Sequence, residues 1–332
     1  WAPDPAPPVG AGGAEPPGNE EKGIMGIWSG KKVAVLYGGR SSEREVSLKT
    51  GAACAEALVS KGYAVELVDV DLDVAARLRA LGTDVAFVAL HGRYGEDGCI
   101  QGLLESMGLP YTGSGVTASA LAMDKTLSKR MFAGIGLSVI DYRAFPREQA
   151  AEIRPRDLPF GLPAVVKPAG EGSSVGVTIA KDPAAFQAAC LEAAKWKGDV
   201  IVERYLKGTE VNVAVLDGKA LGAVEIAPER EFYDYAAKYT AGTTKYHVPP
   251  RIPESQVRSA CDAAERAHKG LGCSGVSRVD FIVSADGTPF ILEVNTLPGM
   301  TGTSLVPKIA AGAEIPFPDL CERILDLASL KA

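Results

Sequence analysis

The chain has 332 residues, of which 46% are hydrophobic and 23% charged, and its net charge is −6. The length is enough for two or three domains, and the composition is near the average for a globular protein. A net negative charge argues against a nucleic acid as partner. No apolar run approaches the length that spans a bilayer, so we expect no membrane partner either. Six scattered cysteines without a CxxC pair indicate reduced thiols in a cytoplasmic protein, and three histidines in no repeated spacing argue against a zinc site.

Residues 1–30 differ from the rest of the chain. They are rich in proline, glycine and alanine and have no apolar period, which predicts a disordered tail. Met25 lies just before the first predicted strand. We therefore hypothesise that translation begins at Met25.

From Lys32 onward, apolar runs alternate with helical patterns. The run KVAVLYGG predicts a buried parallel strand, and a helix, a strand, a helix and a third strand follow it. This order predicts a doubly wound parallel sheet in a Rossmann-like domain over residues 31–118. A long helix over residues 117–136 then leads into hairpin-like strands, which we divide into domains at 119–207 and 208–332. The expected fold class is therefore α/β followed by α+β.

The stretch RVDFIVSADGTPFILEVN predicts a β-hairpin, because two apolar runs flank the turn signal at 286–287. A two-residue turn there places Asp280 opposite Glu293, and Arg278 opposite Asn295. Two facing carboxylates repel each other, so we expect a cation between them. The oxygen ligands of these acids and the amide suit Mg²⁺, whereas the alternative is a solvated polar face on which Arg278 bridges the acids.

Several further segments indicate a nucleotide site, although no Walker A motif is present. In KPAGEGSSVGV, Lys167 ends an apolar strand before a Gly-Ser loop that would cradle phosphate, the alternative being a flexible hairpin tip. In VIVERYLKGTE, Glu203 is followed by Tyr205 and Leu206, which would flank a flat base, and Glu210 would reach sugar hydroxyls. The segment GSGVTA matches a dinucleotide fingerprint only weakly, because no strand that ends in an acid follows at the required distance.

The order of these motifs resembles the ATP-grasp superfamily and, within it, the D-alanine–D-alanine ligases. The resemblance covers the chain from about Lys32 to its end and is carried by YGGRSSEREVSL, LHGRYGEDGCIQGLLESMGLPYTGSG, MDK, VKPAGEGSSVGV, EFYDYAAKY, SRVDF and EVNTLPGMTGTSLVP. It implies a two-part ATP-grasp fold after the N-terminal domain. It also implies a cytoplasmic enzyme of peptidoglycan synthesis, which joins two D-alanines with ATP and two Mg²⁺ (or Mn²⁺) and forms a homodimer.

The resemblance also implies roles for individual residues. For ATP it implies phosphate contacts by Lys125 and Lys167, a covering loop with Ser173 and Ser174, and contacts to the base and the ribose by Glu203, Tyr205, Leu206 and Glu210. For the metals it implies Asp280, Glu293 and Asn295. For D-alanine it implies Glu43 at the first ammonium, His91 nearby and Ser304 at the second carboxylate. Tyr239 would join Glu43 and Ser173 beside the substrates, with Lys238 on the same loop, and Arg278 and the Gly299 N–H would face the reacting carbonyl.

Other interpretations of these residues remain open at the level of the sequence. Glu43 and Ser42 would serve equally as helix caps, His91 as a satisfied polar group at a strand end, and FYDYAAKY as a surface loop. The alternative functions are a ligase that makes D-alanyl–D-lactate or D-alanyl–D-serine, a non-catalytic nucleotide-binding protein, and an oxidoreductase that rests on GSGVTA alone. Tyr239 disfavours the D-lactate enzyme, because it matches the type that forms the dipeptide.

Overall fold

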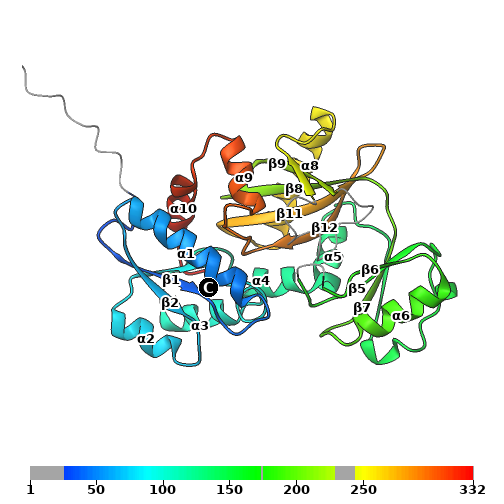
Figure 1. Cartoon of the computed structure of the whole chain (residues 1–332), viewed down its shortest axis with the longest axis horizontal. Coiled ribbons are helices and arrows are strands. Elements are labelled where there is room, and N and C mark those ends of the chain that lie inside the picture. The colour runs from blue at the N-terminus through cyan, green and yellow to red at the C-terminus, as the bar shows by residue number, and fades with distance from the viewer. Residues whose placement is uncertain (1–25, 173–174, 229–243, 332) are drawn as a thin grey trace, which may run out of the picture.

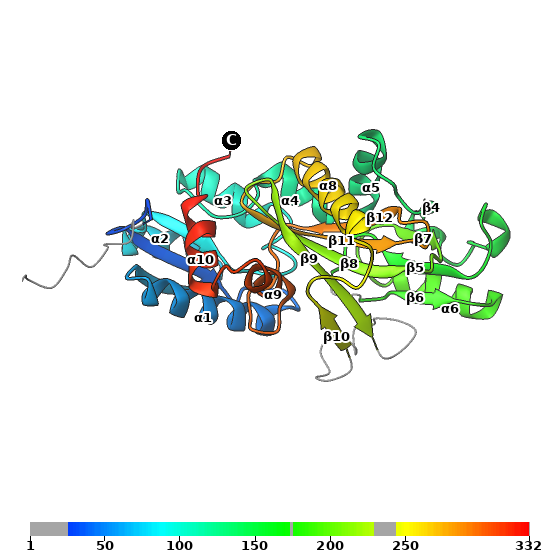
Figure 2. The same cartoon turned by 90° about the horizontal axis from the view of Figure 1, so that it is seen from above.

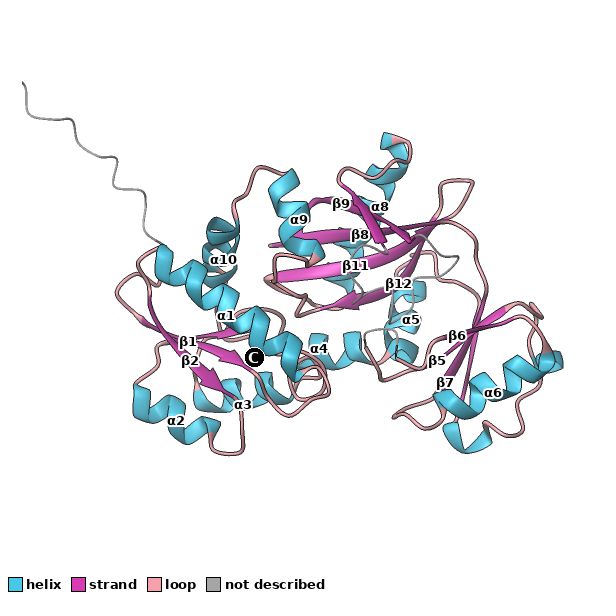
Figure 3. Ribbon diagram, in the orientation of Figure 1, coloured by secondary structure: helices cyan, strands magenta, loops and turns pink. Residues whose placement is uncertain are grey.

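The computed structural model describes residues 26–172, 175–228 and 244–331, and in these ranges the strands form three sheets. Figure 1 shows how they lie in space: the parallel N-terminal sheet is at one end, the small sheet that is central in the sequence is at the other end, and the larger C-terminal sheet lies between them. The alternation of helix and strand can be followed in Figure 3. In the described ranges no helix is long and apolar enough to cross a membrane.

The N-terminal sheet is parallel, with strand order β2-β1-β3, and its strands are β1 (Lys32–Tyr37), β2 (Ala64–Asp69) and β3 (Val85–Val88). Its helices are α1 (Arg44–Ser60), α2 (Val74–Leu81) and α3 (Cys99–Met107). One face of the sheet packs on α1, and the other packs on α2 and α3. A strand that is covered on both faces buries nearly every residue, which explains why β1 is one continuous apolar run. The predicted doubly wound domain is confirmed.

The end of the chain returns to this N-terminal domain (Figure 2). Helices α9 (Leu305–Gly312) and α10 (Phe317–Asp326) share a buried core with α1, β1 and β3. Residues 26–30, which we assigned to the disordered tail, form a turn instead. The N–H of Ile27 donates to Asp326, and Trp28 packs on that same core.

The predicted long helix is two helices, α4 (Val116–Met123) and α5 (Lys125–Gly134). The break falls at Asp124, whose backbone is extended and whose carboxylate accepts hydrogen bonds from the N–H groups of Thr126 (2.9 Å) and Leu127 (3.0 Å). Such a cap satisfies amides that a helix start leaves free. Apolar periodicity runs through the break, so the pattern alone suggested one helix. The break makes Lys125 the first residue of α5.

The central sheet has strand order β4-β7-β5-β6 and packs on α6 (Pro183–Ala193). Its strands are β4 (Tyr142–Phe145), β5 (Ala164–Pro168), β6 (Thr178–Ala180) and β7 (Val200–Arg204). Two short 3-10 helices, η1 (Arg147–Gln149) and η2 (Pro155–Asp157), follow β4. The antiparallel pairing of β5 with β7 places Val165 opposite Glu203 and Lys167 opposite Ile201. Lys167 and Glu203 therefore lie close together on neighbouring strands.

The C-terminal sheet is antiparallel, with strand order β10-β9-β8-β11-β12. Its strands are β8 (Thr209–Leu216), β9 (Lys219–Pro228), β10 (Thr244–His247), β11 (Val276–Val283) and β12 (Pro289–Asn295). Helix α8 (Glu254–Gly270) and helix α5 cover one face. The opposite face carries the polar side chains described below.

The hairpin of β11 and β12 differs from the predicted one at its turn. Ser284 pairs with Thr288 around a three-residue loop, 285–287, in which Gly287 has φ +87°, so the predicted two-residue turn is wrong. A left-handed residue at this position is typical of three-residue hairpin loops. A β-bulge at Leu292 compensates for the shift, so Asp280 still lies opposite Glu293 and Arg278 opposite Asn295. The bulge changes the core face: Ile291 is buried there, in place of the predicted Phe290 and Leu292.

Candidate active site

Two cavities meet between the sheets. The first encloses about 210 Å³ between the N-terminal and C-terminal domains, and the second about 500 Å³ between the central and C-terminal sheets. Both are lined by the same five residues where they join: Lys125, Glu210, Ile226, Asp280 and Glu293. Every predicted site residue within the described ranges lines at least one of these cavities.

The second cavity combines charged and apolar walls. Lys167 from β5 and Glu203 from β7 line it, followed by Tyr205 and Leu206 after β7 and Glu210 from β8. Its apolar wall consists of Ile140, Val165, Ile282 and Leu292 among others. An apolar slot with a few polar groups at one side is the usual form of a small-molecule site. Leu292 lies in this wall because of the β-bulge.

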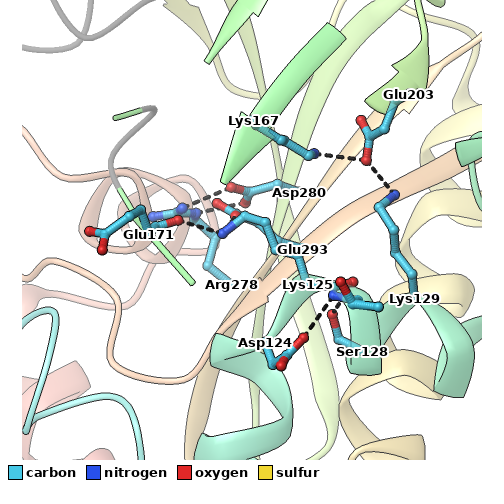
Figure 4. A network of polar contacts seen from close by, with 11 residues as sticks. Asp124, Lys125, Ser128, Lys129, Lys167, Glu171, Glu203, Arg278, Asp280 and Glu293 are labelled. Atoms are coloured by element: carbon cyan, nitrogen blue, oxygen red, sulfur yellow. Dashed lines mark hydrogen bonds and ion pairs between the residues drawn. The ribbon is translucent and has the colours of Figure 1, made fainter. Parts of the chain in front are cut away.

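Glu203 is 2% exposed and lies between two lysines (Figure 4). Its Oε1 is 2.7 Å from the Lys129 ammonium and 2.8 Å from the Lys167 ammonium. Burial alone would raise the pKa of Glu203, but the charges of Lys129 and Lys167 outweigh it and hold the pKa at about 2. The carboxylate is therefore ionised at neutral pH and lies at the cavity wall as a strong hydrogen-bond acceptor.

Lys125 connects the Gly-Ser loop after β5 to the acids of the hairpin. Its Nζ donates to the backbone oxygen of Glu171 at 2.6 Å and lies 3.1 Å from the Glu293 carboxylate. Burial lowers the pKa of Lys125, but Glu293, together with Glu96 and Glu203, opposes it, and the net shift of the pKa is upward. Lys125 thus brings a positive charge to the junction of the two cavities.

The two acids face each other on one side of the hairpin, as the register predicted. Arg278 binds the Asp280 carboxylate with two hydrogen bonds, 2.7 Å and 2.8 Å long, and Lys125 pairs with Glu293. The sequence also allowed this face to be a polar surface on which Arg278 bridges the two acids. The ion pair of Arg278 with Asp280 is one half of such a bridge. Each carboxylate oxygen keeps further lone pairs for other ligands.

The donor set at this junction fits a magnesium ion. Asp280, Glu293 and Asn295 all line the first cavity and offer oxygen ligands, which Mg²⁺ prefers. Asn212 on β8, directly opposite Asp280, is buried, and within the described residues its Nδ2 lacks a hydrogen-bond partner. A buried amide without a partner is costly, which indicates that this face is arranged to meet a polar ligand. In the described ranges, His, Cys, Asp and Glu side chains form no group of three or more that could hold a metal. Asp280 and Glu293 would therefore hold Mg²⁺ together with other oxygens, such as those of Asn295, a bound ligand or water.

Glu43 and His91 form the N-terminal wall of the first cavity. Glu43 precedes α1, but its side chain makes no capping hydrogen bond; the carboxylate lines the cavity, so the capping interpretation is wrong. His91 is buried, with Nε2 2.9 Å from the Thr50 hydroxyl and Nδ1 3.4 Å from Glu96. Both ring nitrogens therefore have partners, and these partners hold the ring at the cavity.

The segment after β12 forms the opposite wall of this cavity. Ser304 immediately precedes α9, yet its hydroxyl makes no capping bond and accepts a hydrogen bond from the N–H of Thr301 at 3.0 Å. A helix start favours a carboxylate, because its N–H groups and dipole attract negative charge. A Cβ at Gly299 would come within 2.7 Å of the Ser304 hydroxyl, so a larger residue there would displace that hydroxyl from its present position.

Four predicted site residues, Ser173, Ser174, Lys238 and Tyr239, lie outside the described residues. Sequence reasoning missed other residues at the site: Glu96, Lys129, Asn212, Leu292, Thr301 and Thr303. Glu96 lies within the motif LHGRYGEDG, and Asn212 alternates with Glu210 along an apolar strand. Both residues could therefore have been predicted from the sequence. Lys129 is one of several polar residues in a helix and carried none.

Comparison with known protein families gives two matches. The model described as D-ala D-ala ligase C-terminus matches residues 131–326, and the model described as D-ala D-ala ligase N-terminus matches residues 72–114.

Individual relatives extend over nearly the whole chain. The D-alanine–D-alanine ligase of Anaeromyxobacter sp. (strain Fw109-5) is 74% identical over 308 residues, 93% of this chain and 100% of that protein. The enzyme of the same name from Geotalea uraniireducens (strain Rf4) is 55% identical over 301 residues, 91% of this chain and 96% of that protein. The crystal structure of the D-alanine–D-alanine ligase from Bacillus anthracis complexed with ATP has a TM-score of 0.78 and 35% identity, and the match covers 90% of this chain and 96% of that one.

The fold and the joined cavities define the class of protein first. Two antiparallel sheets that enclose a lysine- and acid-lined cavity, preceded by a parallel-sheet domain, make this an ATP-grasp protein. Within that class, the chain belongs to the D-alanine–D-alanine ligase family.

Proposed function

We propose that this protein joins two molecules of D-alanine to form D-alanyl-D-alanine, with ATP converted to ADP and phosphate. The observation that carries the proposal is the placement of Asp280 and Glu293 at the junction of the two cavities. One cavity is apolar enough for a nucleotide base, and the other has an acid and a helix start for an ammonium and a carboxylate. The junction is where a phosphoryl group would pass from one substrate to the other.

In the first half of the reaction, a carboxylate oxygen of the first D-alanine attacks the γ-phosphorus of ATP. The bond to the β-phosphate breaks, and D-alanyl phosphate and ADP form. Lys125 and Lys167 would bind the phosphates, Glu203, Tyr205 and Leu206 the base, and Glu210 the ribose. Glu43 would bind the substrate ammonium, with His91 beside it. Two Mg²⁺ (or Mn²⁺) held by Asp280, Glu293 and Asn295 would neutralise charge on the phosphates.

In the second half, the amine of the second D-alanine attacks the acyl carbonyl, and phosphate leaves. Ser304 and the start of α9 would hold the carboxylate of that substrate. The tetrahedral intermediate carries an oxyanion, which Arg278 and the N–H of Gly299 would stabilise; loss of such a donor typically costs about 10²–10³ in rate. The attacking ammonium must first lose a proton, and Tyr239, in a trio with Glu43 and Ser173, is our candidate to relay it.

The second substrate is the point at which related activities diverge. A D-serine or D-lactate enzyme would use the same nucleotide site. Tyr239 matches the dipeptide-forming type, which disfavours D-lactate, and we favour D-alanine over D-serine because relatives 72% and 74% identical to this chain are named D-alanine–D-alanine ligases. The product would supply peptidoglycan synthesis in the cytoplasm. We also propose that the protein acts as a homodimer.

The proposal is tested by phosphate release from ATP in the presence of Mg²⁺ and single amino acids. We expect turnover with D-alanine, none with L-alanine, and loss of turnover when a chelator removes the metal. D-alanine offered together with D-serine or D-lactate, with the product read by mass spectrometry, assigns the second substrate. Equal release with D-alanine and L-alanine, or no release with D-alanine, would contradict the proposal.

A further inference from the structure

Lys129 is a buried charge that the proposed chemistry does not use. Its side chain, on α5, is 0% exposed, and it does not line either cavity. Its ammonium lies 2.7 Å from Glu203 and 5.5 Å from the centre of the Tyr142 ring. A buried cation costs several kcal/mol unless it is paired, and removal of one partner of a buried pair leaves the other charge uncompensated.

Lys129 and Lys167 contact the same atom, Oε1 of Glu203, at 2.7 Å and 2.8 Å (Figure 4). The two lysines differ in access. Lys167 lines the second cavity and Lys129 does not, so only Lys167 can reach a ligand there. Burial lowers the pKa of Lys129, and the neighbouring Glu203 carboxylate opposes that shift. With both lysines protonated, the cluster has one more positive than negative charge, and Lys167 brings it to the cavity.

We propose that Lys129 is a positioning residue that stays on Glu203 and thereby releases Lys167 to bind the polyphosphate of the nucleotide. This inference rests on the nucleotide-binding part of the proposed function. When Lys167 turns toward phosphate, Glu203 keeps one cation and remains ionised, so it can accept a hydrogen bond from the base. Without Lys129, the same movement would leave a buried carboxylate unpaired, and Lys167 would be held on Glu203.

The experiment compares Lys129→Met with wild type by calorimetric titration with Mg²⁺–ADP and with Mg²⁺–tripolyphosphate, which has phosphates but no base. We expect Lys129→Met to weaken both by at least about tenfold, while the KM for D-alanine changes less than about twofold. Lys219→Met is the matched control, because Lys219 pairs with Glu265 on the surface, and its affinities should equal those of wild type.

A second variant keeps the test decisive if Lys129→Met does not fold. Glu203→Gln removes the acceptor that holds Lys167, so tripolyphosphate should bind Glu203→Gln at least as tightly as wild type. In the double variant, Glu203→Gln should restore most of the tripolyphosphate affinity that Lys129→Met loses.

Unchanged affinities in a folded Lys129→Met variant, or weaker tripolyphosphate binding in Glu203→Gln, would overturn the inference. Binding is measured without D-alanine turnover, so a wild type that binds ADP but releases no phosphate with D-alanine would refute the proposed function and leave this inference standing.

Discussion

At the scale of single residues, the facing carboxylates of Asp280 and Glu293 are the feature on which the chemistry depends. Lys125 and Arg278 pair with them, so the negative charges do not destabilise the hairpin. Replacing Glu293 with glutamine keeps the shape but removes the charge that would hold a metal. We expect Glu293→Gln to lower kcat by at least about 100-fold with an unchanged circular dichroism spectrum.

The matched control is Glu192→Gln, because Glu192 lies at an exposed position near the end of α6 and pairs with Lys195 there. This control should keep wild-type kcat. Near-normal turnover in Glu293→Gln would remove Glu293 from the metal site.

The site residues that could be predicted from the sequence interrupt a regular pattern, whereas Lys129, which was missed, does not. Asp280, Glu293 and Asn295 were found because polar residues interrupt an alternating apolar strand. Lys129 was missed because a lysine is common on helices, and its burial depends on how α5 packs in the fold, against β12 and with Glu203 of β7 beside it. A charge that acts through another residue leaves no pattern in the sequence.

At the scale of elements, two local errors in the predicted hairpin cancelled. The turn holds one residue more than predicted, and the β-bulge at Leu292 adds one residue to the opposite strand, so the acids still face each other. Turn signals such as Asp-Gly occur in both two-residue and three-residue loops, and a bulge has no reliable sequence mark. The pairing at the site was therefore predictable, whereas the identity of the core-facing residues in β12 was not.

The start of α5 offers a test of how an element positions the site. Asp124 caps α5 beside Lys125, and Asp182 caps α6 with the same pair of hydrogen bonds, outside both cavities. Asp124→Ala and Asp182→Ala should each lower the free energy of unfolding by about 1 kcal/mol, measured by urea denaturation. Only Asp124→Ala should raise the KM for ATP, because only that helix start carries Lys125. An equal effect of the two variants on KM would refute this role of the break.

At the scale of the whole molecule, the first and last elements share one core. Helix α10 packs on α1, and Tyr111 after β3 pairs with Ser329 near the chain end. The alternation of helices and strands was enough to predict the parallel sheet, but not that the last helix completes its core. Contacts between residues so far apart in sequence depend on the assembled fold.

Leu320 of α10 is fully buried in that shared core, which gives a test at this scale. Leu320→Ala should lower the free energy of unfolding by about 2–5 kcal/mol. Hydrogen exchange should show faster exchange in β1, although β1 is far away in sequence, and unchanged exchange in β5, which has a separate core. Faster exchange confined to α10 would contradict a shared core. Leu191→Ala, at an exposed site on α6, serves as control.

The central step of the proposed reaction is the transfer of a phosphoryl group from ATP to the carboxylate of D-alanine. The measurement that tests it uses D-alanine labelled with oxygen-18 in both carboxylate oxygens, with ATP and Mg²⁺, and mass spectrometry of the products. If D-alanyl phosphate forms and the second amine displaces phosphate, each inorganic phosphate carries a single labelled oxygen and ADP is the nucleotide product. Unlabelled phosphate, or label that appears in AMP, would contradict the account.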